Sequence, residues 1–231
     1  MKNEQIAIDG PAASGKSTVA HLTAQRLAGY YINTGDMYRT LTWVVRECGI
    51  DPVENAAAVV ALLAEVDIRY ELDQDGIPRL LLNGESVRQS DIRGPEVAAD
   101  VSDVAKIPEV REWMVERQRA TGELGLVVME GRDIGTVIFP DAKYKFFLTA
   151  SAEERARRRL NQAGESPSNA TIESVAAEIA RRDEIDSTRA VAPLRPAADA
   201  EIVDSTNLSP EQVVEHIVTV ILDREEGEGY A

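Results

Sequence analysis

A phosphate-binding loop follows the first apolar run and constrains the fold of this chain more than any other feature. Residues 10–17 read Gly-Pro-Ala-Ala-Ser-Gly-Lys-Ser, directly after the apolar run Ile6-Ala7-Ile8. This is the G-x-x-x-x-G-K-[ST] pattern, in which a strand leads into a glycine-rich loop and then into a helix. The backbone N–H groups of such a loop surround a phosphate chain. The pattern therefore predicts a strand–loop–helix unit that binds a nucleoside triphosphate.

Residues within the loop have distinct expected roles. Gly10 and Gly15 allow backbone torsions that other residues avoid. Lys16 supplies a charge for the outer phosphates, and the Ser17 hydroxyl is the expected protein ligand of Mg²⁺. The helix that begins near Lys16 points the positive end of its dipole at the same anion. The residues predicted to bind the donor nucleotide are Gly10, Pro11, Ala12, Ala13, Ser14, Gly15, Lys16, Ser17 and Thr18.

Composition excludes several classes of protein. The 231 residues suffice for one α/β domain with small inserts. They include no run of about 18 apolar residues and no signal-peptide pattern, so a membrane or secreted protein is not expected. A net charge of −15 disfavours binding to nucleic-acid polymers. The single cysteine, Cys48, excludes an intrachain disulfide framework and fits a reducing cytoplasm, and its place on the stripe of Leu41, Val44 and Val45 predicts that it packs in the core.

The rest of the chain alternates between short apolar runs and segments with helical periodicity. Further strands are expected at Tyr30–Ile32, Leu126–Met129, Lys145–Leu148 and Glu201–Val203. Helices are expected at Ser17–Leu27, Asp36–Glu47, Asn55–Val66, Ala152–Ala163, Ile172–Asp186 and Pro210–Arg224. Pro95–Ala120 is expected to be largely helical, with Pro108 opening its second helix. Five strands separated by helices predict a parallel sheet with helices on both faces.

One segment departs from this alternation. Ile68, Tyr70 and Leu72 alternate with polar residues, the turn Asp73–Gly76 follows, and Arg79–Asn83 runs back. This pattern predicts a β-hairpin inserted into the βα chain, at about residues 67–90.

The strand ends predict the position of the chemistry, because ligands of parallel sheets bind at the carboxyl ends of the strands. The segments that follow the later strands are Asn33–Arg39, Glu130–Thr136, Thr149–Arg159 and Asp204–Asn207. Of the 25 basic residues 20 are Arg, and eight of these fall between Arg155 and Arg195. One interpretation is ion pairing at the surface of helices. The other is a phosphate clamp around a small anionic substrate, because the guanidinium fork matches phosphate oxygens.

Several arginines and carboxylates fall where a second anion could bind. Arg39 and Arg132 follow two of the strands, and Arg182, Asp186 and Arg189 have i, i+4, i+7 spacing on one face of a helix. Two phosphate sites suggest a kinase whose acceptor is itself a phosphate. Such an acceptor needs no histidine base, because a phosphate monoester with a second pKa near about 6 is already largely dianionic at pH 7.

Two other functions stay open at this point. One is a kinase of a small metabolite with a hydroxyl acceptor, in which Asp36 or Asp133 would act as the base. The other is a nucleotide-dependent switch protein. Proteins of that kind usually carry a guanine-reading N-K-x-D segment, and the sequence has none.

Taken together, the motifs resemble those of the bacterial cytidylate kinases over nearly the whole chain. The most specific of them is the run Gly131–Pro140, and the others are Thr34–Arg39, Arg182–Leu194 and Ala197–Ala200. The insert near residues 67–90 resembles the nucleoside-monophosphate-binding extension of that family. The resemblance implies a single P-loop kinase domain that uses ATP and Mg²⁺ to phosphorylate CMP and dCMP. A cytoplasmic monomer is expected.

The resemblance also implies roles for individual residues. Arg39, Arg132 and Arg189 would bind the acceptor phosphate, and Arg182 and Asp186 would contact the ribose. The residues expected to bind CMP are Thr34, Tyr38, Arg39, Ser102, Arg111, Arg132, Asp133, Arg182, Asp186 and Arg189. The residues expected to take part in catalysis are Lys16, Arg132, Arg158 and Arg189. Residues 155–168 join four arginines to a Gly-, Ser- and Pro-containing loop, and they are the expected lid over the phosphates.

By the same resemblance Ser102, Arg111 and Asp133 would read the base. A carboxylate such as Asp133 can accept a hydrogen bond from the exocyclic amine of cytosine, while Arg111 donates to the ring. Uracil presents a carbonyl oxygen where cytosine has the amine, so this pairing would disfavour it.

The chain departs from the family pattern at three positions near the expected site. The family usually has Asp at the position of Asn33, Ala at that of Asp36 and Asp at that of Glu130. Negative charge is therefore displaced by a few residues, and the carboxylate at position 130 has a longer reach.

Overall fold

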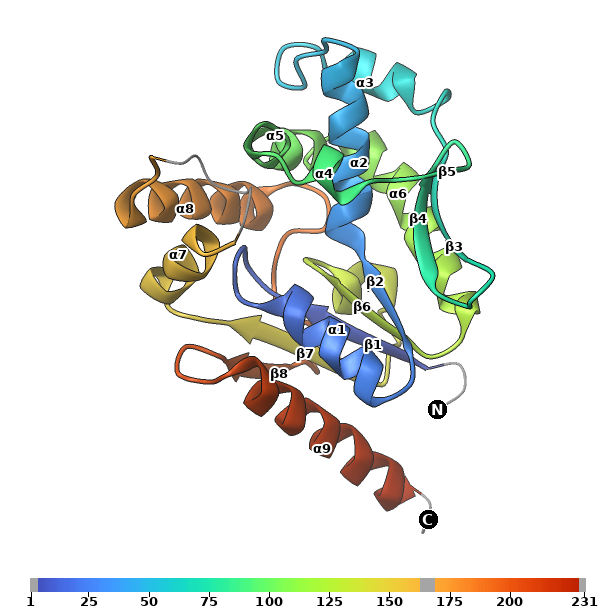
Figure 1. Ribbon diagram of the computed structural model, residues 1–231, viewed down its shortest axis with the longest axis vertical. Helices are drawn as coiled ribbons and strands as arrows, with labels where there is room; N and C mark the ends of the chain where they lie inside the picture. Colours follow the sequence, from blue (N-terminus) through green and yellow to red (C-terminus); the bar gives the residue numbers. More distant parts are fainter. Residues whose placement is uncertain (1–3, 163–168, 229–231) are drawn as a thin grey trace.

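A five-stranded parallel sheet forms the centre of the structure, a computed structural model that describes residues 4–162 and 169–228. The strand order is β2–β6–β1–β7–β8, and every neighbouring pair is parallel (Figure 1). The strands are β1 (Gln5–Asp9), β2 (Tyr30–Asn33), β6 (Val127–Gly131), β7 (Tyr144–Thr149) and β8 (Glu201–Asp204). The sheet predicted from the βα alternation is confirmed, because each expected strand is present and shifted by no more than two residues at either end.

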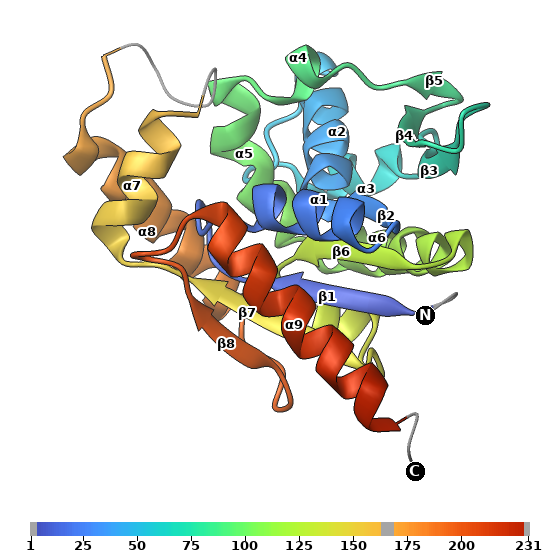
Figure 2. The ribbon, with the colours of Figure 1, turned by 60° about the horizontal axis from the view of Figure 1, so that its bottom comes forward.

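Strand residues pack alternately on the two faces of the sheet. Ile6 and Ile8 of β1 pack toward α1 (Lys16–Arg26) and α9 (Pro210–Glu228), which lie side by side across one face (Figure 2). Ala7, between them, packs on the opposite face of the sheet. This face is covered by a one-turn π-helix (Ile134–Ile138), by α6 (Pro108–Ala120) and by the short 3-10 helix Thr121–Leu124. Burial on both faces explains why the central strands read as continuous apolar runs.

A second layer above the sheet holds its own core. It is built from α2 (Thr34–Glu47), α3 (Ala56–Leu62), α4 (Gln89–Ile92), α5 (Pro95–Ala105), α6 (Pro108–Ala120) and an antiparallel sheet of β3 (Ile68–Leu72), β4 (Pro78–Leu82) and β5 (Glu85–Ser86). Met37, Leu41, Val104 and Met114 are fully buried at its centre. The predicted hairpin is confirmed as β3 and β4, whereas β5 and α4 are too short to have a periodic signal.

Two helices that follow β7, namely α7 (Ala152–Leu160) and α8 (Ile172–Thr188), pack beside the phosphate loop. In these helices Ala156, Val175 and Ile179 are buried against Ala12 of the loop (Figure 1). Part of the expected lid, residues 163–168, lies outside the described residues.

Three details differ from the sequence predictions. Cys48 is exposed, because α2 ends at Glu47 and the chain turns away before the apolar stripe reaches it. The helix expected over residues 55–66 ends at Leu62 and continues as turns. The last helix extends past Arg224 to residue 228, because the Glu225 carboxylate accepts hydrogen bonds from side chains of β7 and its flank. In the described part of the chain, no helix is both long and apolar enough to cross a membrane.

Candidate active site

One cavity of about 590 Å³ lies at the carboxyl edge of the sheet and joins the phosphate loop to the second layer. Every residue predicted to bind the acceptor lines it, and so do the four predicted catalytic residues. The second half of the loop, Ala13–Thr18, also lines the cavity. Gly10, Pro11 and Ala12 do not reach its wall, so their contribution to the predicted site is to shape the loop.

The wall of this cavity is positively charged in a protein that is strongly acidic overall. Its nine cationic residues are Lys16, Arg39, Arg93, Arg111, Arg132, Arg158, Arg159, Arg182 and Arg189. Its five carboxylates are Asp36, Glu130, Asp133, Glu154 and Asp186. The chain as a whole carries a net charge of −15. The excess of positive charge in the cavity therefore marks it as an anion site.

Two glycines of the phosphate loop are required by their surroundings. A Cβ on Gly10 would lie 2.0 Å from the carbonyl oxygen of Leu148, so β7 can approach the loop only if residue 10 has no side chain. Gly15 has φ +92°, and a Cβ there would lie 3.3 Å from Nη1 of Arg158. The loop is thus a tight turn between β1 and α1, with its curvature set by these two residues.

Lys16 folds back over the loop. Its Nζ donates to the carbonyl oxygen of Pro11 at 2.7 Å. Burial and, after it, the nearby Arg132 guanidinium lower the pKa of Lys16 to about 7, against the opposing effects of Glu130 and other carboxylates. A phosphate chain in the loop would favour the charged form of this lysine.

Asp9, at the end of β1, accepts hydrogen bonds from the turn that directly follows two of the predicted site residues. Its two carboxylate oxygens accept hydrogen bonds from the backbone N–H groups of Ile134 and Gly135, each at 2.8 Å. Arg132 and Asp133 directly precede this turn. Burial raises the pKa of Asp9 to about 7 despite these two hydrogen bonds. Sequence reasoning missed Asp9, although its position directly before the loop was a usable signal.

Arg158 is fastened to the phosphate loop. Its guanidinium donates to the carbonyl oxygen of Ser14 at 3.1 Å and to the hydroxyl and carbonyl oxygens of Ser205 at 2.9 and 2.6 Å. The Ser205 hydroxyl follows β8 and lies 3.2 Å from the same Ser14 carbonyl. The structure thus gives Arg158 a role in supporting the donor loop from the side.

A cluster of buried arginines lines the same cavity as the loop. Arg39, Arg159 and Arg182 are each only 5–6% exposed. Burial, followed by repulsion from neighbouring arginines, lowers the pKa of Arg39 and Arg182 to about 10 and that of Arg159 to about 9, so all three are charged at neutral pH. Nε and Nη1 of Arg182 have no hydrogen-bond partner among the described residues. Buried donors that lack acceptors are costly, and an anion would satisfy them.

Arg159 was not selected from the sequence. On α7 its side chain shares the buried face with Ala156, three residues earlier. That i, i+3 spacing distinguishes it from the neighbouring arginines and was the available signal. Burial and then Arg182 and Arg39 lower the pKa of Arg159, which therefore lies close to the arginine cluster of the cavity wall.

Asp186 contacts two arginines of the cavity wall, Arg132 and Arg189. The Nε of Arg132 donates to its carboxylate at 2.9 Å, and Nη1 of Arg189 lies 3.6 Å from its other oxygen. Burial opposes ionisation of Asp186, but Arg132 and Arg189 prevail and hold the pKa of this carboxyl below its usual range. The predicted shared face holds for Arg182 and Asp186, which lie one turn apart on α8, whereas Arg189 follows the helix as its extended C-cap residue; all three are buried in the cavity wall.

The predicted base-reading residues meet at the far end of the cavity. The carboxylate of Asp133 contacts the guanidinium of Arg111, a side chain only 1% exposed. Arg111 also donates to the carbonyl oxygen of Ala105 at 3.2 Å and lies 5.6 Å from the ring centroid of Tyr38. Ser102 on α5 is buried beside this pair in the cavity wall. Hydrogen-bond donors and acceptors are thus placed together in this part of the cavity wall.

Two of the departures from the family pattern are linked by one tyrosine. The amide of Asn33 donates to the Tyr31 hydroxyl at 3.0 Å, and that hydroxyl donates to the Glu130 carboxylate at 2.6 Å. Asn33 also caps α2 by accepting from the N–H of Asp36 at 3.1 Å. The Thr34 hydroxyl donates to the backbone oxygen of Glu130 at 2.7 Å, which joins β2 to β6 at the cavity floor.

The third departure, Asp36, pairs with α4 and with the residue that follows this helix. Its carboxylate accepts from Arg93 at 2.5 Å and from the amide of Gln89 at 3.1 Å. The other candidate base, Asp133, is likewise engaged with Arg111. Because both carboxylates are paired with guanidinium groups, neither is placed to take a proton from a hydroxyl acceptor.

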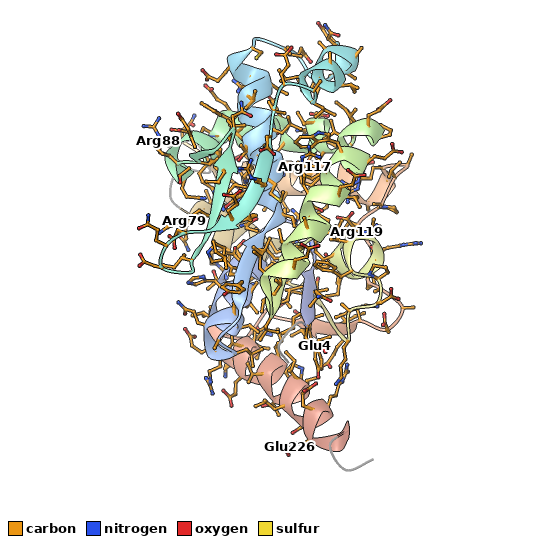
Figure 3. The ribbon with its side chains drawn as sticks, turned by 90° about the vertical axis from the view of Figure 1, so that its right-hand side faces the viewer. Glu4, Arg79, Arg88, Arg117, Arg119 and Glu226 are labelled. Atoms are coloured by element: carbon orange, nitrogen blue, oxygen red, sulfur yellow. The ribbon has the colours of Figure 1, made fainter. Side chains whose placement is uncertain are left out.

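Arginines on the outer face of the second layer behave as ordinary surface residues. Figure 3 shows Arg79, Arg88, Arg117 and Arg119 on the outer face formed by β4, the segment after β5, and α6. Arg79 pairs with Asp73 at 2.8 Å, and the Arg117 guanidinium lies 3.6 Å from the ring centroid of Trp113. Surface ion pairing thus accounts for some of the arginines, whereas those of the cavity wall are the candidates for a phosphate clamp.

The residues of the loop and of β6 fit a magnesium ion held mainly by phosphates. Ser17 is exposed to the cavity, and the Glu130 carboxylate also lines it. Among residues 4–162 and 169–228, no group of three or more His, Cys, Asp or Glu could hold a metal on its own. Mg²⁺ takes oxygen ligands and usually keeps phosphate and water ligands beside one or two from protein. A hydroxyl and one carboxylate match that donor set.

Comparison with known proteins identifies relatives along the whole chain. The cytidylate kinase family model matches residues 6–223. A cytidylate kinase of Geobacillus kaustophilus is 51% identical over 95% of this chain and 96% of the relative, and one of Corynebacterium glutamicum is 46% identical over 94% and 93%. The crystal structure of a shikimate kinase from Bacteroides thetaiotaomicron superposes with a TM-score of 0.50 at 14% identity, covering 96% of this chain and 98% of that one. At that identity the likeness shows the fold alone.

Proposed function

The chain belongs to the cytidylate kinase family, and we propose how its residues divide the work of that enzyme. Family membership makes the reaction ATP-dependent phosphorylation of CMP. The observation that supports the assignment of roles is the single cavity shared by the phosphate loop and the buried arginine cluster. A reaction between two phosphates needs both anions in one place, with enough positive charge to offset their repulsion.

The donor triphosphate lies along the loop in this proposal. Backbone N–H groups of residues 13–18 and the N-terminus of α1 bind its phosphates, and Lys16 pairs with the outer ones. Arg158 supports the loop from behind through Ser14 and Ser205. Mg²⁺ would be held by Ser17 and, directly or through water, by Glu130, and when bound it neutralises charge that develops on the phosphates.

The acceptor phosphate binds to Arg39, Arg132 and Arg189 opposite the loop. An oxygen of this phosphate attacks the γ-phosphorus, a new P–O bond forms, and the bond from that phosphorus to the bridging β–γ oxygen breaks. ADP and CDP are the products. Arg132 lines the same cavity as Lys16 and donates to Asp186, and we assign it a position between the two phosphate sites. There it stabilises charge as it moves from one phosphate to the other.

The nucleoside of CMP extends away from the loop. Arg182 and Asp186 contact the ribose in this proposal, and the Arg111–Asp133 pair reads the cytosine together with Ser102. Asp133 accepts from the exocyclic amine, which uracil lacks. Deoxycytidylate has the same base and phosphate, so we propose it as a second acceptor.

Three further expectations are part of the proposal. Residues 155–168 act as a lid, with Arg155 and Arg158 already in contact with the loop. Residues 67–90 belong to the monophosphate-binding part of one kinase domain, because Tyr70 of β3 donates to the backbone oxygen of Asn33 at 3.2 Å. The enzyme works as a monomer in the cytoplasm, where its one cysteine stays reduced.

An ADP-release assay across acceptors tests this proposal. With ATP and Mg²⁺ held constant, CMP and dCMP should give the highest kcat/KM, UMP a lower value, and AMP and GMP turnover near background. Cytidine is the control for a hydroxyl acceptor and should give none, since it lacks the phosphate that the arginines bind. Turnover of cytidine comparable to that of CMP, or a preference for a purine monophosphate, would contradict the proposal.

A further inference from the structure

Asp183 of α8 forms a hydrogen bond with the backbone of the phosphate loop. Oδ1 of Asp183 accepts a hydrogen bond from the backbone N–H of Ala12 at 3.0 Å. Its other oxygen contacts the Arg155 guanidinium, and that same guanidinium donates to the carbonyl oxygen of Ala12 at 3.2 Å. The backbone N–H and the backbone carbonyl of Ala12 are thus both held by the Asp183–Arg155 ion pair. Neither Asp183 nor Arg155 is in the cavity wall.

The same helix carries the acceptor-binding face. Arg182 immediately precedes Asp183, and Asp186 is three residues further on. Both line the cavity, whereas Asp183 points to the loop. A displacement of α8 that changes the acceptor subsite must therefore also move the group that holds Ala12.

Binding of the acceptor phosphate gives a physical reason for such a displacement. Arg182 is buried with Arg39, Arg132 and Arg159 around it, and repulsion among these cations opposes the close packing of α7 and α8 against the cavity. A phosphate dianion bound to Arg39 and Arg132 adds negative charge beside Arg182 and Arg159 and so offsets that repulsion. The acceptor therefore has a different interaction free energy with an inward and an outward position of α8, which is the condition for a ligand to shift an equilibrium.

We propose that Asp183 and Arg155 are positioning residues that transmit occupancy of the acceptor subsite, through α8, to the shape of the donor loop. The inference rests on the proposed division of the cavity between CMP and ATP. With the acceptor bound, the loop is held in the form that binds the triphosphate. By thermodynamic reciprocity, bound donor raises the affinity for the acceptor by the same factor.

Calorimetry measures this coupling factor directly. The dissociation constant of CMP is measured alone and with a saturating non-hydrolysable ATP analogue and Mg²⁺, and the ratio of the two values is the factor. Coupling between sites is typically about 5- to 150-fold, so we expect at least about 5 for the wild type. In Asp183→Ala and in Arg155→Ala the factor should fall toward 1, while the dissociation constant of CMP alone changes by less than about threefold, because neither residue touches the acceptor subsite.

Matched variants separate the link from general damage. Glu184→Ala removes the same charge one residue further along α8, from an exposed side chain, and should keep the wild-type factor. The double variant Asp183→Ala with Arg155→Ala should show no further loss, because the two residues act as one unit. Asp183→Asn keeps an acceptor for the Ala12 N–H but loses the charge paired with Arg155, and should give an intermediate factor. Thermal unfolding of each variant establishes that it is folded at the assay temperature.

Different outcomes would contradict the proposed link between the subsites and the proposed function. If the wild type makes CDP and its coupling factor is near 1, or if Asp183→Ala retains the wild-type factor, the proposed link is wrong and the assigned reaction is unaffected. If the wild type makes no CDP from CMP under the same conditions, the proposed function is wrong. Loss of the factor in both single variants, with wild-type values in Glu184→Ala, supports the link.

Discussion

Replacing Asp133 by Asn separates reading of the base from binding of the phosphate. The Asp133 side chain is 6% exposed, contacts Arg111, and has one oxygen 3.7 Å from Nη2 of Arg189. Asparagine has nearly the same size and keeps one acceptor oxygen. It can also present an amide donor to the base, and it no longer offsets the charge of the two arginines. Cytosine, which presents an amine at this point, therefore loses its preferred partner.

The size of the effect follows from the number of contacts that change. One good polar pair to a base edge is worth about 1–3 kcal/mol of discrimination, which corresponds to a fall of about 5- to 150-fold in kcat/KM for CMP. UMP presents a carbonyl oxygen at the same point, so it should lose less or gain. The ratio of kcat/KM for CMP to that for UMP should therefore fall by at least about fivefold.

The assay is ADP release with each acceptor on the same enzyme sample. Loss of one partner of a buried ion pair also destabilises the fold, by about 3–5 kcal/mol where nothing compensates. The ratio of the two substrates is insensitive to that loss, because the folded fraction of the sample is common to both. Asp141→Asn, which changes an exposed carboxylate eight residues further along, is the control and should leave the ratio unchanged. Equal losses for CMP and UMP would show that Asp133 supports the pocket and that the base is read elsewhere.

Three further changes have defined outcomes. Arg132→Ala should lower kcat by about 10³ with a smaller change in the KM for ATP, since in the proposed arrangement its guanidinium, held by Asp186, lies between the two phosphates; a change confined to that KM would contradict the assignment. The folded-state pKa of Lys16 is lowered to about 7 and bound phosphate favours its charged form, so above pH 7 donor binding should take up a proton and weaken by up to about tenfold per pH unit. Calorimetry at pH 8 in two buffers of different ionisation enthalpy measures that uptake, and a value of zero would refute it. Hydrogen exchange of residues 155–162 should slow when both subsites are filled, and unchanged exchange would count against a lid.

Most of the fold is visible in the sequence because each element of the sheet carries a local signal. β1, β6 and β7 are buried on both faces and read as apolar runs, and Gly10 follows β1 where the loop must turn. The elements that were missed are those in which tertiary contacts replace a local pattern. β5 has two residues and α4 has four, and both are held by the surrounding chain.

The site was predicted where its residues occur in recognisable spacings and missed where only packing decides. Arg182 and Asp186 were found because they have i, i+4 spacing on one helical face, and Arg189 because it follows them at i+7, just past the end of the helix. Arg159 and Asp9 were not, because their importance depends on which side of α7 is buried and on a turn that lies more than a hundred residues away in sequence. The contacts of Arg158 with Ser14 and Ser205 could not be read from the sequence either, since they join three separate segments.

A bisubstrate compound tests most directly the claim that one cavity holds both phosphates. In this compound cytidine and adenosine are joined through their 5′ positions by a chain of five phosphates, so it fills the donor loop and the acceptor subsite together. The structure predicts that it inhibits competitively against ATP and also against CMP, that one molecule binds per chain, and that it binds more tightly than either substrate. Arg182→Ala and Lys16→Ala should each weaken its binding, because they lie on opposite sides of the same cavity. Inhibition that is competitive with ATP but not with CMP would contradict the account, because the acceptor would then bind outside this cavity.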